Sequence, residues 1–267
     1  MEKLVIIPTF NEKENISHIL HAIFGLRQDF HVLVVDDGSP DGTGTIVKSL
    51  QQEFPSQLFI EERKEKAGLG SAYIHGFRWA LARDYQFIFE MDADFSHNPQ
   101  DLSRLYDACK TGGADLSIGS RYIKGGGVKN WPRNRILLSK GGSFYTRMIT
   151  FMPVRDPTAG FVCYKKEVLE AINLDHIHFV GYAFQIEMKF VAWKLKFKLK
   201  EVPIVFQDRT IGSSKMNRSI IKEGILGVLR LRWHSWFTNY RKKVSNIQAR
   251  HQTAGPLSAN EVLAGPK

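Results

Sequence analysis

The chain has 267 residues, of which 43% are hydrophobic and 24% are charged, a composition typical of a globular protein with one domain or a domain plus appendages. The formal net charge of +10 indicates an anionic partner, such as nucleic acid, an anionic membrane or a phosphorylated substrate. We expect no signal peptide, and no apolar run reaches the roughly 18 residues that a membrane-spanning helix requires.

The first half of the chain alternates between strand and helix patterns. Short runs of β-branched or aromatic residues, bounded by turn residues, predict strands at residues 4–7, 32–35, 58–60, 87–89 and 116–118. Apolar residues spaced i, i+3, i+4 and i+7 predict helices at residues 16–24 and 102–109. This alternation indicates an α/β fold with a mostly parallel sheet, and such sheets bind ligands outside the carboxyl ends of their strands.

The second half is richer in basic and aromatic residues. The glycines at 125–127 open a loop, and residues 131–152 mix basic with large apolar side chains. We expect a helix around residues 186–193, one or two strands up to residue 206, and a helical pattern from residue 221 that becomes basic and aromatic. The predicted organisation is a main domain at residues 1–230, a basic aromatic amphipathic extension at 231–243 and a disordered tail at 244–267.

Two carboxylates follow one of the predicted strands directly. Asp92 and Asp94 are two residues apart in an extended segment, so their side chains point to the same side. Such a pair can share one hard cation such as Mg²⁺ or Mn²⁺, whose remaining ligands are usually water and the phosphates of a substrate. The alternative is two solvated acids in the turn before Asn98 and Pro99.

Other polar residues follow neighbouring strands. Asp37 could accept a hydrogen bond from a base or a ribose, or it could belong to a simple turn that contains Asp and Gly. The glycine-rich segment at 66–71 lacks the spacing of a dinucleotide or P-loop motif, so a plain helix start is the simpler explanation. Arg209 and Lys215 flank a loop of small residues that could close over a diphosphate, although such cations are also common on solvated surfaces.

Eight motifs occur in an order that is typical of one family. They are PTFNE (8–12), DDGSPDGT (36–43), GLG followed by AY (68–73), MDAD (91–94), GSRY (119–122), DPTAGF (156–161), GYAFQIE (181–187) and DR with SK (208–215). With these motifs the chain resembles, over roughly residues 1–230, the family 2 glycosyltransferases of the dolichyl-phosphate mannose synthase type and their bacterial polyprenyl-phosphate relatives.

The resemblance implies a GT-A fold, which is a Rossmann-like, mostly parallel sheet flanked by helices. It also implies an inverting, metal-dependent transfer of mannose from GDP-mannose to a polyprenyl phosphate, with Mg²⁺ or Mn²⁺ as cofactor. Two alternatives remain open: the same reaction with UDP-glucose or a UDP-N-acetylhexosamine, and a catalytically silent protein that binds nucleotides or lipid surfaces. The positive net charge is the only feature that suggests a nucleic-acid partner. Because no recognised nucleic-acid-binding motif accompanies it, we expect no such partner.

The resemblance also assigns site residues. The nucleotide of the donor would contact Pro8, Phe10, Glu12, Val35 and Asp37. Ribose and diphosphate would contact Asp92, Ala93 and Asp94, with Asp94 the principal metal ligand and Asp92 a second one. The diphosphate would be bound by Arg209 and Lys215, and the acceptor phosphate by Arg121, Arg135 and Ser139. The residues expected to act in catalysis are Asp94, Arg121, Arg209 and Lys215.

Two positions depart from the pattern of the relatives. Some relatives have a glutamine that binds the metal where this chain has Ser96, so a water molecule is expected to take that place. Several relatives have an arginine where this chain has Val162, so a polar contact near Asp156 is expected to be missing here.

A polyprenyl acceptor implies contact with a membrane. Residues 131–152 and 221–243 combine tryptophans, apolar residues and Lys or Arg, the composition of helices that lie in a membrane interface. The alternative is two ordinary amphipathic helices that pack on the domain. Cys109 and Cys163 match no metal or redox spacing and are expected to be reduced core residues. We therefore expect a cytoplasmic protein that associates peripherally with the cytoplasmic face of a membrane.

Overall fold

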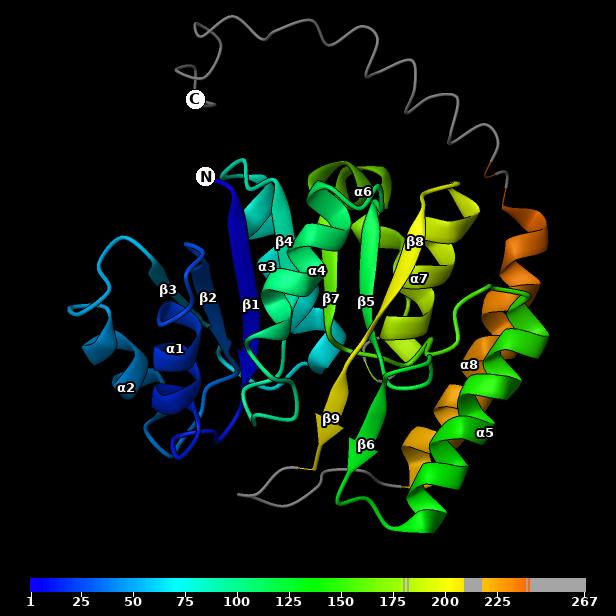
Figure 1. Ribbon diagram of the computed structural model, residues 1–267, viewed down its shortest axis with the longest axis horizontal. Coiled ribbons are helices and arrows are strands. Elements are labelled where there is room, and N and C mark those ends of the chain that lie inside the picture. Colours follow the sequence, from blue (N-terminus) through cyan, green and yellow to red (C-terminus); the bar gives the residue numbers. More distant parts are fainter. Residues whose placement is uncertain (180, 182, 209–217, 239, 241–267) are drawn as a thin grey trace, which may run out of the picture.

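The computed structural model describes residues 1–179, 181, 183–208, 218–238 and 240. A central sheet is covered by helices on both faces, and a long helix pair, α5 and α8, packs at one end of the sheet (Figure 1). The strands are β1 (Lys3–Thr9), β2 (His31–Asp36), β3 (Leu58–Glu62), β4 (Phe87–Glu90), β5 (Leu116–Ser120), β6 (Gly127–Lys129), β7 (Val162–Lys165), β8 (Leu199–Pro203) and β9 (Val205–Gln207). The helices are α1 (Ile16–Phe24), α2 (Thr43–Leu50), α3 (Leu69–Leu81), α4 (Asp101–Lys110), α5 (Arg133–Thr150), α6 (Lys166–Ala171), η1 (Leu174–His176), α7 (Ala183–Lys194) and α8 (Arg218–Phe237).

The main sheet has the strand order β3-β2-β1-β4-β7-β5-β8. All neighbouring strands are parallel except β7, which runs antiparallel between β4 and β5. The strands β6 and β9 form a separate parallel ribbon beyond the carboxyl ends of β5 and β8. The carboxyl ends of β1, β2, β4 and β5 therefore meet at one edge of the sheet, at the bottom of Figure 1.

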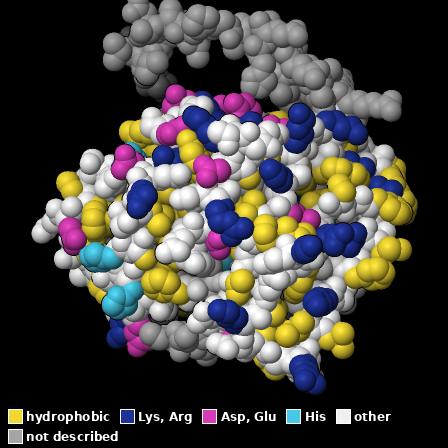
Figure 2. Space-filling model, viewed as in Figure 1, with side chains coloured by type: hydrophobic (Ala, Val, Ile, Leu, Met, Phe, Trp, Pro, Cys, Tyr) yellow, Lys and Arg dark blue, Asp and Glu magenta, His cyan; other side chains and the backbone are white. Residues whose placement is uncertain are grey.

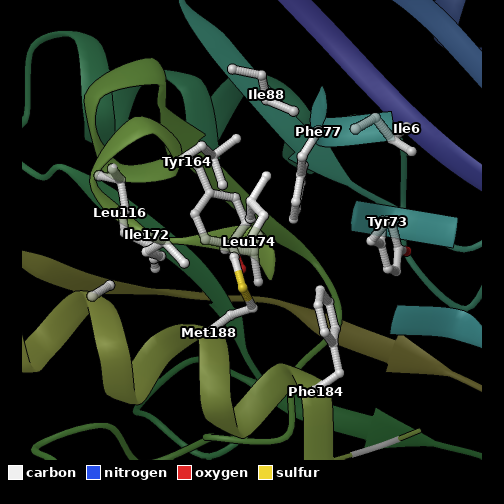
Figure 3. Close-up of a cluster of buried hydrophobic side chains, with 14 of the residues drawn as sticks. Ile6, Tyr73, Phe77, Ile88, Leu116, Tyr164, Ile172, Leu174, Phe184 and Met188 are labelled. Atoms are coloured by element: carbon white, nitrogen blue, oxygen red, sulfur yellow. The ribbon is translucent and has the colours of Figure 1, made fainter. Parts of the chain in front are cut away.

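Alternating side chains of the strands build two cores. In β1, Val5 and Ile7 pack under the layer of α1, α2 and α4, whereas Leu4 and Ile6 pack under α3, α6 and α7. Figure 3 shows part of the second core, where the rings of Phe77 in α3 and Tyr164 in β7 meet edge to face with centroids 5.4 Å apart. Because central strands are covered on both faces, their sequences read as continuous apolar runs.

Each of the five strands and two helices predicted in the first half is confirmed, as is the mostly parallel sheet. The sequence analysis did not predict β7, a strand of only four residues. The predicted segment up to residue 206 is two strands, since β8 ends at Pro203 and β9 begins at Val205. Only the tertiary arrangement separates them, because they belong to different sheets.

The expected domain boundary at residue 230 falls inside α8, whose Val228 and Leu231 are both buried. The predicted tail at 244–267 lies outside the described residues. Cys109 and Cys163 are buried and unpaired, as expected of core residues. Within the described part of the chain, no helix is both long enough and apolar enough to cross a membrane.

Candidate active site

A cavity of about 1140 Å³ opens at the carboxyl edge of the sheet. At one end it is lined by the segments that follow β1, β2 and β4, and at the other by α5 and by the chain between β5 and α5. Among the described residues, all those predicted for the donor except Val35, and all three predicted for the acceptor phosphate, thus contribute to the same cavity. Its lining includes Pro8, Phe10, Glu12, Asp37, Asp92, Ala93, Asp94, Arg121, Arg135 and Ser139.

Asp37 lies at the donor end and is held by an arginine that the sequence analysis did not identify. The Nε and Nη2 atoms of Arg63 each lie 2.6 Å from Asp37 Oδ1, and Nη1 of the same arginine donates to Ser71 Oγ at 2.7 Å. Burial raises the pKa of Asp37, although Arg63 opposes that shift. Nothing in the sequence pairs these residues, because they meet only through the parallel pairing of β2 with β3.

The preceding residue has a different role. The Asp36 carboxylate accepts hydrogen bonds from Thr9 Oγ1 at 2.8 Å and from the backbone and side chain of Ser39 at 2.9 and 2.6 Å. It therefore fixes the turn after β2 against the end of β1 and leaves Asp37 to face the cavity.

The structure corrects the prediction for Val35. Its side chain is fully buried in the core between the sheet and α3, and it does not line the cavity. The residue is still paired with both neighbouring strands, two residues before the chain reaches the cavity at Asp37. The structure therefore does not place the Val35 side chain in the predicted donor site.

Asp92 and Asp94 follow β4 and both line the cavity. Asp94 is buried, and its Oδ1 accepts a hydrogen bond from the backbone of Ser96 at 3.0 Å, whereas the Asp92 side chain is 39% exposed. Within the described residues, no group of three or more His, Cys, Asp or Glu side chains is arranged to hold a metal ion. The two carboxylates fit a Mg²⁺ or Mn²⁺ ion that takes its other ligands from water and a bound diphosphate.

His97 packs behind these carboxylates and was not predicted. Its ring stacks on Phe161 at 4.8 Å and meets Phe206 edge to face at 5.3 Å, while Nδ1 lies 3.5 Å from the backbone nitrogen of Asp92. Burial lowers the pKa of His97 to about 4, even though Asp94 opposes that shift. The imidazole is therefore neutral at pH 7.

A buried lysine lies next to the cavity. Lys189 Nζ donates to the backbone oxygens of Ala159 and Gln185, at 2.7 and 3.0 Å, and to Gln185 Oε1 at 3.0 Å. Burial lowers the pKa of Lys189 to about 8 and raises the pKa of Glu90 to about 8, while the two opposite charges attract each other. Since Ala159 and Gln185 both line the cavity, Lys189 ties two of its walls together.

The three predicted acceptor residues lie near one another at the other end of the cavity. Arg121 makes a bidentate pair with the fully buried Asp156, from Nε to Oδ2 and from Nη2 to Oδ1, both at 2.7 Å. Arg121 Nη2 also donates to Thr158 Oγ1 at 2.9 Å. The guanidinium is thereby fixed in orientation before any substrate arrives.

Arg135 is held in a similar way by a second carboxylate. Its Nη1 donates to both oxygens of Asp208 at 2.9 Å, and its buried Nε has no hydrogen-bond partner among the described residues. Ser139 lies one turn further along α5 and accepts a hydrogen bond from the Tyr122 hydroxyl at 2.6 Å. Arg209 and Lys215, predicted to bind the diphosphate, lie outside the described residues, and Asp208 is the last described residue before them.

Beside the cavity, α5 and α8 expose large apolar side chains. In α5 the buried positions are the small polar residues Ser143, Thr146 and Thr150, so the helix turns its apolar side outward. We call this surface the α5–α8 face; it consists of Leu137, Leu138, Phe144, Met148, Phe151, Leu226, Leu229, Trp233, Trp236 and Phe237. Figure 2 shows hydrophobic and basic side chains intermixed on this side of the molecule.

Comparison with known proteins agrees with this geometry. The profile of glycosyl transferase family 2 matches residues 4–172, which include β1 to β7 and most of the cavity lining. The chain belongs to glycosyl transferase family 2. This family 2 chain is 48% identical to the polyprenol monophosphomannose synthase of Mycolicibacterium smegmatis. The match spans 225 residues, which are 84% of each of the two chains. It is 45% identical over 230 residues to the undecaprenyl-phosphate mannosyltransferase of Micrococcus luteus, covering 86% of this chain and 93% of that one.

Solved structures show that the fold is the GT-A-like α/β fold expected of a family 2 glycosyltransferase. The glucosyl-3-phosphoglycerate synthase of Mycobacterium tuberculosis, in complex with Mn²⁺, UDP and glucosyl-3-phosphoglycerate, matches 86% of this chain and 79% of its own with a TM-score of 0.61 and 16% identity. A mannosyltransferase of Pyrobaculum calidifontis, in complex with GDP-Man and Mn²⁺, matches 95% of this chain and 76% of its own with a TM-score of 0.54 and 16% identity.

Proposed function

We propose that this glycosyltransferase moves mannose from GDP-mannose to a polyprenyl phosphate, with inversion at the sugar and with a divalent metal ion. The observation that carries the proposal is the single cavity that joins the Asp92 and Asp94 carboxylates to the arginines 121 and 135. A diphosphate with its metal ion suits the first end, and a phosphate anion suits the second. The names of the two curated relatives support a mannosyl donor and a polyprenyl acceptor.

In the proposed reaction an oxygen of the acceptor phosphate attacks the anomeric carbon of mannose. The bond from that carbon to the diphosphate breaks, and GDP leaves with the electron pair. The attacking phosphate is largely ionised at pH 7, because the second pKa of a phosphomonoester is about 6, so the step requires no general base. The catalytic difficulty is the repulsion between an anionic nucleophile and an anionic donor.

Side chains at both ends of the cavity reduce that repulsion. The arginines 121 and 135 would neutralise the acceptor phosphate, and their carboxylate partners already hold the guanidinium groups in place. Asp92 and Asp94 would hold Mg²⁺ or Mn²⁺ against the donor diphosphate, where the ion stabilises the charge of the leaving group. Arg209 and Lys215 would add positive charge on the same side. The complex of the P. calidifontis enzyme with GDP-Man and Mn²⁺ supports this assignment of donor and ion.

The lipid part of the acceptor would leave the cavity along α5. Leu137, Leu138 and Gly141 of α5 and Gly224 of α8 line this part of the cavity. Leu137 and Leu138 also belong to the exposed α5–α8 face. We propose that this face docks on the cytoplasmic surface of a membrane and so brings the polyprenyl phosphate to Arg135. The exposed basic residues Arg133, Lys140 and Arg147 of α5 would contact anionic lipid headgroups.

The proposal is tested by incubating the protein with polyprenyl phosphate, Mg²⁺ or Mn²⁺ and a panel of labelled nucleotide sugars. We expect label from GDP-mannose in the organic phase. Label from UDP-glucose or a UDP-N-acetylhexosamine instead would show the same type of reaction with a different donor. No transfer from any donor would favour a silent binding protein.

The residue expected to matter most in that assay is Asp94. Asp94→Ala should reduce transfer by about 10²–10³-fold or more, because one preorganised electrostatic interaction with the diphosphate is lost. The exposed Asp107 on α4 offers a matched control, and Asp107→Ala should retain full transfer. Near-normal turnover by Asp94→Ala, with an unchanged circular dichroism spectrum, would contradict the mechanism.

A further inference from the structure

The ring of Trp131 lies close to both arginines of the acceptor site. It is located at the junction of the β6–β9 ribbon and α5, and it lines the cavity. The Cζ atom of Arg135 lies 4.1 Å from the centroid of its ring, and the Cζ atom of Arg121 lies 5.6 Å from the same centroid. Both distances are within the range of cation–π attraction.

The two kinds of arginine contact use different parts of the guanidinium group. The carboxylates of Asp156 and Asp208 accept hydrogen bonds from N–H groups at its edge. An aromatic ring instead attracts the face of the planar group and takes up none of its donors. The contact with Trp131 therefore takes up none of the N–H groups that bind a carboxylate or a phosphate.

The tryptophan is itself fixed by neighbours that reach to the donor end. Its ring meets Phe206 of β9 edge to face at 5.3 Å, and Phe206 meets His97 in the same manner at 5.3 Å. The pairing of β6 with β9 aligns Val128 with Phe206, and the backbone nitrogen of Asp208 donates to Lys129 O at 3.2 Å. The ribbon therefore sets the position of Trp131 relative to the carboxylate that holds Arg135.

We propose that Trp131 is a positioning residue for the acceptor phosphate: its ring, together with the two carboxylates, holds the guanidinium groups of Arg135 and Arg121 in place to bind the phosphate. This inference rests on the proposed function, since it takes a phosphate monoester to be the ligand of the two arginines. It assigns Trp131 to acceptor binding, because the two cations near its ring are the arginines predicted to bind the acceptor phosphate.

The test measures acceptor and donor separately. Farnesyl phosphate, a short prenyl phosphate that needs no membrane, serves as acceptor, and its binding is followed by calorimetry in the presence of GDP and Mn²⁺. Trp131→Leu should weaken farnesyl phosphate binding and raise its KM by about tenfold, while the affinity for GDP stays unchanged. Trp131→Phe should restore most of the acceptor binding, because a ring is again present.

A further variant separates the charge distribution of the Trp131 ring from its packing. Site-specific replacement of Trp131 by trifluorotryptophan keeps the shape of the ring and weakens its negative face, so it should also raise the acceptor KM. This variant can be assayed even where Trp131→Leu is too unstable. Trp79 stacks on Arg83 at 3.8 Å but does not line the cavity, and Trp79→Leu is the matched control that should leave both affinities unchanged.

The outcomes distinguish this inference from the proposed function. If the unaltered protein binds no farnesyl phosphate, both the acceptor assignment and the role of Trp131 are overturned. If it binds farnesyl phosphate and the leucine and trifluorotryptophan variants bind it equally well, the proposed function stands and the role of Trp131 is overturned. An equal loss of GDP and acceptor affinity would also overturn it, since a general structural role would then explain the effect.

Discussion

At the scale of single residues, His97 illustrates how burial sets the chemistry of the site. Its ring is enclosed between Phe161 and Phe206, and burial lowers its pKa from an ordinary value of 6.5 to about 4. A neutral ring can pack behind Asp92 and Asp94 without adding a positive charge that would compete with a metal ion for these carboxylates. The histidine thus supports the site without titrating at pH 7.

The lowered pKa makes folding sensitive to acid. Below pH 6.5 the unfolded chain protonates this histidine and the folded chain does not until about pH 4, so the free energy of unfolding falls as the pH falls. His97→Phe removes the titrating group and keeps a ring against Phe161. Between about pH 7 and pH 4, denaturant unfolding should show the unaltered protein losing up to about 3 kcal/mol more than this variant. Equal losses for the unaltered protein and the His97→Phe variant would contradict the assignment.

At the scale of helices, a glycine is required for packing in α3 but not in α5. A Cβ at Gly76 of α3 would lie 2.7 Å from Ile6 Cγ2, so the missing side chain lets the helix approach β1. A Cβ at Gly141 of α5 would meet nothing within 4 Å. Both glycines lie inside helices, but only Gly76 faces a strand that leaves no room for a side chain.

The same substitution should therefore have opposite effects at these two positions. Gly76→Ala should lower the free energy of unfolding by about 1–3 kcal/mol, because overpacking against Ile6 outweighs the better helix propensity of alanine. Gly141→Ala should raise it by about 0.5–1 kcal/mol, since nothing opposes the gain in propensity. Denaturant unfolding of both variants measures the difference. A stabilised Gly76→Ala protein would show that α3 can move away from β1 at little cost.

At the scale of the whole molecule, basic residues lie beside the exposed apolar α5–α8 face. The net charge of +10 is explained in part by basic residues on α5 and α8, beside an apolar face in which Phe144 is 63% and Trp233 is 59% exposed. Large apolar patches of this kind mark interaction surfaces rather than ordinary solvated surface. The mixture of tryptophan, leucine and arginine is that of a helix lying in a membrane interface.

Vesicle sedimentation tests the membrane assignment directly. Binding should increase with the content of anionic lipid and decrease with salt, because each basic residue near the surface contributes about 1 kcal/mol through a screened attraction. Lys140→Glu with Arg147→Glu should weaken binding, and Trp233→Ala with Trp236→Ala should weaken it even at low salt. Lys64→Glu changes an exposed lysine after β3 and is the matched control. Binding that is insensitive to both lipid charge and salt would exclude an electrostatic anchor.

Much of the fold and part of the site could be predicted from local patterns. The strands, the parallel sheet and the carboxylates at the end of β4 follow from periodicity and from residues that stand next to each other in the chain. The motif order was sufficient to indicate the family, which the comparisons confirm. Val35 was misassigned because β2 is still paired with both β1 and β3 at that residue, where its side chain packs in the core, and the chain reaches the cavity only at Asp37.

The sequence by itself determined the chemistry available to this protein: acidic residues at the strand ends, basic aromatic helices and the order of the family motifs. Only the tertiary structure decided which partners those residues have. Arg63 reaches Asp37, Arg121 reaches Asp156 and Arg135 reaches Asp208 across 26, 35 and 73 residues of chain. Such contacts arise from strand pairing and helix packing, which bring together segments that no local pattern relates. For the same reason, the closeness of Trp131 to both arginines is visible only in the folded chain.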